Sequence, residues 1–154
     1  RAEPMMLKEY FNRWYLVAYI PALQEMRTFG IDRLEELIIL NQKFKKRDLD
    51  PKAQFRDIIG LNYNDSPLTK IRIAFSERQW KYAKALPLHR SQMLIPQLKF
   101  NEQYPVVVEY RLRPNYEFLQ EILKLGSQVV VLEPESVKEA VLQELKTSLK
   151  QYSS

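Results

Sequence analysis

The sequence predicts an α+β protein made of two small domains, and three observations support this. Apolar and polar residues alternate with period two over much of residues 13–40, whereas strand and helix patterns follow one another from residue 69 onward. Turn-forming residues cluster at 62–67, between these two regions. Of the 154 residues, 45% are hydrophobic and 28% are charged, which is the balance of a globular chain with a buried core. We therefore predict one domain over residues 1–64 and a second over residues 65–154.

In the first domain the hydrophobic pattern predicts three strands. Residues 13–20 alternate as a strand that Pro21 stops, because proline has no N–H to give to a neighbouring strand. Alternation resumes over residues 26–34, where Gly30 marks a bulge or a close approach of two backbones. The Leu-Ile-Ile-Leu run at 37–40 is predicted to be the third strand.

The helices are predicted from their N-terminal caps and apolar stripes. Four residues have the position and chemistry of helix caps: Asp50, Ser76, Asn115 and Ser136. Ser76 with Gln79, and Ser136 with Glu139, have the spacing of a capping box. These caps predict helices over residues 51–59, 76 to about 85, 115 to Gly126, and from 136 onward. The last helix carries apolar residues at fourfold spacing: Val137, Val141, Leu145 and Leu149.

In the second domain the strands and helices follow a recognisable order. The predicted strands are residues 69–75, 92–98, 105–112 and 129–132. Together with the helices they give strand, helix, strand, strand, helix, strand, followed by a terminal helix. This is the split βαβ arrangement of ferredoxin-like folds, so we predict a ferredoxin-like βαββαβ domain with a C-terminal helix.

The composition excludes several classes of function. The chain has no cysteine and a single histidine, His89, which argues against a disulfide framework, a thiolate site and a zinc centre. Its three glycines are scattered, so no phosphate-cradling loop is present, and no nucleophile has an evident base. Apolar runs are far shorter than the ~20 residues that span a bilayer. We expect no enzyme activity, no cofactor, no metal and no membrane partner, and a cytoplasmic location in a reducing compartment.

The charge balance permits a polyanionic partner but does not require one. Lysine and arginine number 24 against 19 aspartate and glutamate residues, a net charge of +5 spread over both domains. An ordinary solvated basic surface explains this excess equally well.

The first two strands predict a surface rich in arginine and aromatic residues. If Ile20 pairs with Met26 in an antiparallel hairpin, one face of the sheet is apolar. The other face then carries Arg13, Tyr15, Tyr19, Arg27, Phe29 and Arg33. Guanidinium groups bind phosphate or carboxylate through paired hydrogen bonds, and tyrosine rings stack on bases. We therefore predict a site for an anionic ligand on this face.

A structural explanation of the same residues remains open. The predicted helix at 51–59 could cover the aromatic rings, and the arginines could pair with Asp32, Glu35 or Glu36. The predicted faces also depend on the register, because a slip of one residue reverses them.

Several segments resemble a known protein family. Residues 13–19, Arg-Trp-Tyr-Leu-Val-Ala-Tyr, and residues 27–34, Arg-Thr-Phe-Gly-Ile-Asp-Arg-Leu, resemble the signature of WYL-domain bacterial transcriptional regulators. Residues 86–92, Leu-Pro-Leu-His-Arg-Ser-Gln, resemble a linker motif found in a subset of them, although Arg90 stands where we expect proline. Residues 123–134 are similar to their C-terminal extension domain.

This resemblance implies a fold and a function. It implies that the first domain is a small Sm-like (SH3-type) β-barrel that senses a ligand, with single-stranded DNA or RNA or a nucleotide as the favoured class. The family's basic and aromatic positions map onto Tyr15, Arg27, Phe29 and Arg33, whereas Arg13 and Tyr19 come from strand alternation alone. The ligand would change the operator affinity of a homodimer through an N-terminal helix-turn-helix domain. That domain is absent here, and the barrel's first strand, before residues 4–10, is expected to be missing.

Two alternatives follow from the sequence. One is a protein-interaction or oligomerisation module without a ligand, suggested by the missing strand and the apolar terminal helix. The other is a small-molecule or nucleotide sensor near Pro67 or Pro87, at the junction of the domains.

Overall fold

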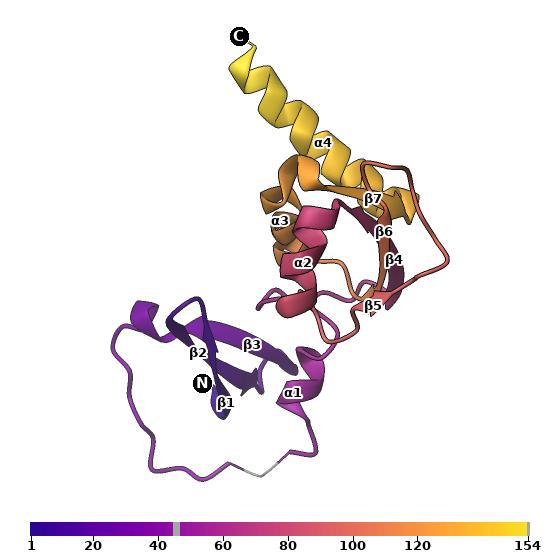
Figure 1. Ribbon diagram of the computed structural model, residues 1–154. Helices are drawn as coiled ribbons and strands as arrows, with labels where there is room; N and C mark the ends of the chain where they lie inside the picture. Colours follow the sequence, from indigo (N-terminus) through magenta and orange to yellow (C-terminus); the bar gives the residue numbers. More distant parts are fainter. Residues whose placement is uncertain (45–46, 154) are drawn as a thin grey trace. The chain divides into compact units, whose positions relative to one another are not determined.

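The computed structural model describes residues 1–44 and 47–153, and within it the chain forms two compact units. The first unit is Arg1–Arg56 and the second is Asp57–Ser154. Each unit contains one antiparallel sheet, and the chain is a mixed α and β protein, as predicted (Figure 1).

The division between the units lies before the predicted boundary at residues 64 and 65. The backbone N–H groups of Leu61 and Asn62 donate to Oε1 of Glu117 at 3.1 and 3.0 Å. The N–H of Arg113 donates to the carbonyl of Asp57 at 2.6 Å. Residues 57–64 therefore belong to the second unit, because their backbone polar groups are satisfied there.

The first unit is built on a three-stranded antiparallel sheet. Its strands are β1 (Glu3–Tyr10), β2 (Arg13–Ile20) and β3 (Glu25–Gly30), in the order β1-β2-β3. A 3-10 turn, η1 (Ile31–Arg33), follows β3, and a single helical turn, α1 (Pro51–Gln54), lies near the end of the unit. Among the described residues β1 and β3 each pair only with β2, so this sheet is open and no closed barrel is found.

The predicted third strand at residues 37–40 is wrong. Leu37 and Ile39 are 71% and 89% exposed, and the segment joins neither sheet in the part of the chain that the structure describes. Its β-branched, apolar composition is typical of strands, but a strand also requires a partner backbone, and none of the described strands pairs with it.

The helix predicted over residues 51–59 is shorter than expected. Its start is confirmed, because Asp50 accepts the Lys52 N–H at 2.9 Å and Pro51 occupies the first turn. It ends at Gln54, because the N–H groups of the next two residues donate to the carbonyls of Lys52 and Ala53, three residues back, and no α-helical bond to the fourth residue back follows.

The second unit contains a four-stranded sheet with helices between its strands. Its strands are β4 (Thr69–Phe75), β5 (Met93–Leu94), β6 (Val106–Leu112) and β7 (Val129–Glu133), in the order β5-β6-β4-β7. Its helical segments are α2 (Glu77–Ala85), α3 (Tyr116–Lys124), the 3-10 turn η2 (Gly126–Gln128) and α4 (Glu135–Tyr152). All neighbouring strands are antiparallel.

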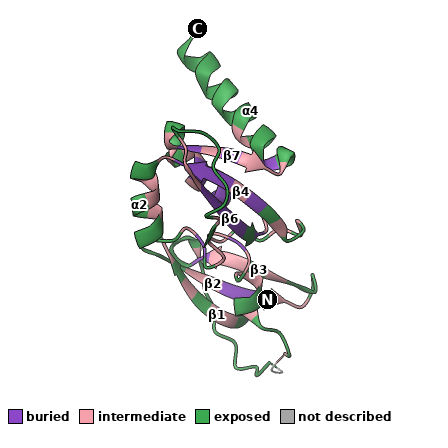
Figure 2. Cartoon of the chain, turned by 45° about the vertical axis from the view of Figure 1, so that its right-hand side comes forward, coloured by how far each residue is buried: buried purple, intermediate pink, exposed green. Residues whose placement is uncertain are grey.

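The core of this unit lies on one face of the sheet. Alternate residues of β4 and β6 face the helices, because strand side chains alternate between faces. The innermost members are Ile71, Ile73, Phe75, Val108, Tyr110, Leu112, Phe118 and Ile122. Figure 2 shows the buried strands β4 and β6 and the exposed outer half of α4.

Two predicted caps of this unit are confirmed and one is wrong. Ser76 accepts the Gln79 N–H at 3.2 Å, and Asn115 accepts the Phe118 N–H at 2.9 Å. Ser136, in contrast, lies inside α4, which begins at Glu135 after Pro134 and has no side-chain cap. The Pro134 carbonyl accepts from residues 137 and 138, so the helix begins earlier than the capping-box spacing predicts.

The predicted strand at residues 92–98 shrinks to Met93–Leu94. Pro96 has no N–H to donate, and the Leu98 N–H turns back to the Ile95 carbonyl at 3.1 Å. The remaining strands of the unit agree with the prediction to within one residue.

Candidate anion-binding surface

The register of the first hairpin differs by one residue from the predicted pairing. Tyr19 lies opposite Met26, and Ile20 lies opposite Glu25 rather than Met26. The loop is one residue shorter than expected because Gln24 adopts the left-handed conformation (φ 54°), which closes the turn. The slip moves β3 side chains to the opposite face from the one predicted.

One face of the sheet, called here the tyrosine face, carries most of the predicted site. Cross-strand pairing places the following residues on it: Glu3, Met6, Lys8, Tyr10, Arg13, Tyr15, Val17, Tyr19, Met26 and Thr28. Of the residues on this face, Val17 is fully buried, whereas Tyr15 and Tyr19 are half-buried. The tyrosine rings are therefore held in place but remain partly accessible.

Arg33 also reaches the tyrosine face, although it lies outside the strand. A Cβ atom on Gly30 would lie 2.8 Å from Nε of Arg33 and 2.9 Å from Oδ1 of Asp32. Gly30 pairs with Tyr15, so the space that a side chain would fill here belongs to the tyrosine face. Glycine at this position lets the Arg33 side chain fold back over β3 beside Tyr15.

Arg47 completes the surface and was not among the predicted site residues. Its Nε donates to Oε2 of Glu3 at 2.7 Å, and its Nη2 donates to Oε1 at 3.4 Å. Its guanidinium carbon lies 3.9 Å from the centre of the Tyr19 ring. The hydrogen bond to Glu3 raises the pKa of Arg47, so this guanidinium stays charged. No local pattern marks Arg47, because its partner lies 44 residues away along the chain.

The tyrosine face carries more positive than negative charge. Its cations are Lys8, Arg13, Arg33 and Arg47, and its carboxylates are Glu3 and Asp32. Arg13 pairs with Asp32 at 3.5 Å, but both side chains are about half exposed, so solvent weakens this pair. Within the described residues Arg33 forms no salt bridge. The face can therefore accept additional negative charge.

Part of the tyrosine face is covered by the segment after α1. The Lys8 ammonium lies 5.0 Å from the centre of the Phe55 ring. The helix predicted over residues 51–59, which could have covered the aromatic rings, is therefore present only in part. Its observed counterpart α1 is one turn long and leaves Arg13 and Arg33 exposed.

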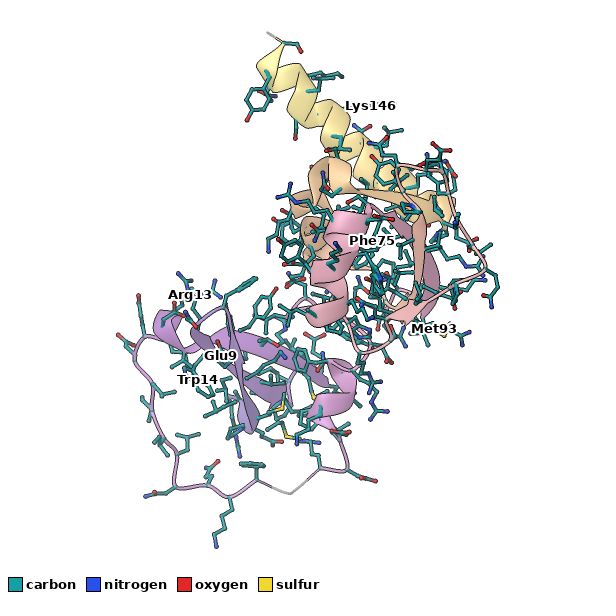
Figure 3. The ribbon with its side chains drawn as sticks, viewed as in Figure 1. Glu9, Arg13, Trp14, Phe75, Met93 and Lys146 are labelled. Carbon is teal, nitrogen blue, oxygen red and sulfur yellow. The ribbon has the colours of Figure 1, made fainter. Side chains whose placement is uncertain are left out.

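Arg27 and Phe29 lie on the opposite face of the same sheet. Arg27 pairs with Ala18, and its Nε is 2.5 Å from Oε1 of Glu25. Phe29 pairs with Leu16. This tryptophan face is defined by Leu7, Glu9, Trp14, Leu16, Ala18, Ile20, Arg27 and Phe29. Figure 3 labels two of its members, Glu9 and Trp14. The structure thus unites four of the six predicted residues and separates Arg27 and Phe29 from them.

The segment that resembled a linker motif has a structural role in the second unit. The Ser91 N–H donates to Nδ1 of His89 at 3.2 Å, so this ring nitrogen accepts. Gln92 bonds the Ala83 carbonyl through Nε2 at 2.8 Å and accepts from the Tyr110 hydroxyl at 2.9 Å. The motif therefore ties the end of α2 to β6.

The described residues show neither a metal site nor a membrane span. No group of three or more histidine, aspartate or glutamate side chains within residues 1–44 and 47–153 is arranged to hold a metal ion. None of the helices described is long and apolar enough to cross a bilayer.

Comparison with known proteins gives two domain matches that follow one another along the chain. The WCX domain matches residues 67–149, and the WYL domain matches residues 1–39. No curated protein matches the chain. Among solved structures, the chain is similar to proteasome accessory factor B/C (PafBC) of Arthrobacter aurescens, with 18% identity and a TM-score of 0.43. That similarity covers 94% of this chain and 22% of the other, so this chain spans about a fifth of its length.

Proposed function

This chain belongs to the WCX-domain family and carries a WYL domain before its WCX domain, and on that premise we propose that it is the effector-sensing and dimerisation region of a bacterial transcriptional regulator. Its ligand is an anion, such as single-stranded nucleic acid or a nucleotide, bound on the tyrosine face. The observation that supports this most directly is the excess of positive charge on that face, where Arg33 is exposed and forms no salt bridge within the described residues.

The stacking of Arg47 on Tyr19 supports the chemistry of the proposal, although the hydrogen bonds of this guanidinium go to Glu3. A guanidinium stacked on an aromatic ring and bonded to a carboxylate is a geometry that also suits a phosphate beside a base. Arg33 and Arg13 lie at the other end of the face, near Tyr15, and are exposed to solvent. A ligand with two or more phosphates could contact both ends.

Sensing would follow from a shift between conformations that already exist. An anion that binds one arrangement of the region more tightly than another shifts the equilibrium by that difference in affinity. Any effect on operator DNA would pass through a DNA-binding domain outside these 154 residues. We expect no catalysis and no cofactor in this process.

The binding surface can be tested with a labelled single-stranded oligonucleotide. We expect Arg33→Ala and Arg47→Ala each to weaken binding by about 1–3 kcal/mol, the range for hydrogen bonds to charged groups. Binding should also weaken steeply as salt rises, because phosphate contacts release counterions. Fluorescence anisotropy at two salt concentrations measures both effects.

Arg27→Ala is the matched control, because it removes the same charge from the opposite face. Its binding should match that of the wild type at both salt concentrations. If Arg27→Ala and Arg33→Ala lose the same binding affinity, the ligand is not confined to the tyrosine face. That result would support the family-based assignment of Arg27 and Phe29 to the site. Wild-type affinity in both Arg33→Ala and Arg47→Ala would contradict the proposal.

We also propose the finer fold assignments that the family implies. The strand order β5-β6-β4-β7, with helices after the first and third strands, supports a ferredoxin-like second unit. The three-stranded sheet of the first unit is proposed to be part of an Sm-like barrel. An experimental structure of a longer chain would test whether this sheet closes.

A ligand-free interaction module is the second candidate, and three ion pairs favour it. Arg13 is paired with Asp32, Arg27 with Glu25 and Arg47 with Glu3, so part of the positive charge is already neutralised. Sedimentation with and without oligonucleotide separates the candidates, since only a sensor shifts with the ligand. A thermal-shift screen of nucleotides tests the smaller ligand class, because a ligand at ~100 times its dissociation constant stabilises by about 2.7 kcal/mol.

A further inference from the structure

The outer side of α2 carries positive charges that no acidic residue neutralises. Arg78, Lys81 and Lys84 are all exposed to solvent. None of the three forms a salt bridge with any residue in the ranges 1–44 and 47–153. In α3 and α4, by contrast, a lysine pairs with a glutamate one turn away. The charges of α2 are therefore available to a partner.

The position of Arg78 is unfavourable for the helix itself. It is the second residue of α2, in the first turn, where the helix dipole already places partial positive charge. Lys81 follows three residues later on the same side of the helix, so two like charges are neighbours. A cation that opposes its own helix indicates that the side chain serves another purpose, because sequences depart from local preference mainly at functional sites.

Apolar side chains lie beside these cations on α2. Tyr82 and Leu86 follow Arg78 at intervals of four residues and are 63% and 83% exposed. Lys81 and Ala85 are also four residues apart and form the neighbouring ridge. We call these five residues the α2 surface. A shallow hollow on it is lined by Glu77, Arg78, Lys81, Tyr82 and Ala85.

The inner side of α2 holds this surface in place. The Trp80 ring packs edge-on against Phe75, with 6.3 Å between the ring centres and 63° between the planes. Near the end of the helix, Gln92 donates to the Ala83 carbonyl at 2.8 Å. Figure 2 shows exposed residues along the outside of α2. A surface that is fixed before binding loses little conformational entropy when a partner arrives.

We propose that the α2 surface binds an acidic, amphipathic peptide segment of another protein. Carboxylates of the segment face Arg78 and Lys81, and its apolar side chains cover Tyr82 and Leu86. The surface belongs to the second unit, so this inference goes beyond the anion site proposed for the first unit and does not depend on it.

Two features favour a peptide over a nucleic-acid strand. The Glu77 carboxylate lines the same hollow as the cations and repels a continuous row of phosphates, whereas a peptide can place an amide there. Leu86 is the other feature, because its exposed side chain offers apolar area that a phosphate backbone cannot cover.

Selection of random dodecapeptides displayed on phage tests the surface on the full chain. We expect the selected peptides to be acidic, with apolar residues three or four positions apart. Fluorescence anisotropy with a labelled selected peptide then measures the affinity of each variant. Arg78→Glu and Tyr82→Ala should each weaken binding about tenfold, because the first reverses a charge and the second removes an aromatic anchor.

Lys70→Glu is the matched control for the charge reversal. Lys70 is exposed and lies next to Ile71 in β4, so its side chain is on the face of the sheet away from the core and the helices. Lys70→Glu should therefore bind the selected peptide as the wild type does. Thermal unfolding separates lost binding from lost folding. Arg78→Glu should unfold at the wild-type temperature or above it, because a carboxylate suits the first turn of a helix.

Three results would overturn the proposal. The first is a selection that yields no peptide, or only peptides without net negative charge. The second is equal affinity of the selected peptide for the wild type, Arg78→Glu and Lys70→Glu. The third is a single-stranded oligonucleotide that displaces the peptide and itself loses affinity for Arg78→Glu, since the surface would then bind nucleic acid instead.

Discussion

The phenol of Tyr110 is one of the largest side chains in the core of the second unit. It is 1% exposed, and its hydroxyl donates to Oε1 of Gln92 at 2.9 Å. Burial raises the pKa of Tyr110, because the charged phenolate has no water around it. The folded state therefore holds this proton more tightly than the unfolded chain does.

The stability of the protein is expected to depend on this proton at high pH. The contribution of Tyr110 is complete below the unfolded pKa of ~10 and falls by about 1.4 kcal/mol per pH unit above it, as only the unfolded state loses the proton. Tyr110→Phe should cost about 1 kcal/mol at neutral pH and should flatten the decline above pH ~10. Denaturant unfolding of both proteins between pH 8 and pH 11 measures this. If the free energies of unfolding of the wild type and Tyr110→Phe fall in parallel between pH 8 and pH 11, the prediction is wrong.

At the scale of residues, the sequence predicted which kinds of side chain form the candidate site, arginine and tyrosine, but not the full set of residues in it. The alternation in β2 correctly joined Arg13, Tyr15 and Tyr19 on one face. The position of β3 depended on the conformation of Gln24, which a side-chain pattern does not encode. Arg47 was missed because contacts distant in sequence leave no local periodic signal.

At the scale of elements, the helix caps show what local sequence determines. Ser76 accepts from the Gln79 N–H at 3.2 Å and also donates to Oε1 of Gln128 at 2.9 Å. Capping is a local interaction, so the start of α2 could be predicted from four adjacent residues. The start of α4 could not be predicted in this way, because the helix begins directly after Pro134, which provides no side-chain capping bond.

Two serine substitutions compare a real cap with an expected one. Ser76→Ala should destabilise the protein by about 1 kcal/mol, because an amide at the start of α2 loses its acceptor. Ser136→Ala should be neutral or slightly stabilising, since Ser136 is exposed inside a helix and alanine is the better helix former. Chemical denaturation with an unchanged m-value measures both. An equal loss in both variants would show that Ser136 also acts as a cap.

Strands proved less predictable than helices wherever pairing decided the outcome. Residues 69–75 and 105–112 lie in the middle of a sheet, and their alternation located them to within a residue. Residues 37–40 have an equally strong strand composition but no neighbouring backbone to pair with in the described structure. Sequence pattern measures the preference of a segment, whereas pairing depends on the rest of the chain.

At the scale of the whole molecule, the two units differ in how much core they bury. In the first unit the buried hydrophobic residues are Val17 and Ala18, whereas the second unit holds the large cluster around Phe75 and Tyr110. Burial of apolar side chains is the main source of stability, at about 25 cal/mol per Å². The first unit is therefore the weaker of the two.

Each unit contains one of the two tryptophans, and this permits a direct test. Trp14 reports on the first unit and Trp80 on the second. In Trp80→Phe, the remaining fluorescence should change at a lower denaturant concentration than in Trp14→Phe. Far-UV circular dichroism of the wild type should show both transitions. Coincident midpoints for the two variants would indicate that the units unfold as one.

The uncovered Leu-Ile-Ile-Leu run has a consequence for the behaviour of the protein in solution. Short uncharged segments with high β-propensity and no proline can stack into intermolecular sheets. Here the run is bracketed by Glu35 and Glu36 on one side and by Lys43 on the other. Such charges act as gatekeepers, since every chain added to a stack would bring like charges together. The solubility of the first unit thus depends on three flanking residues as much as on its folded sheet.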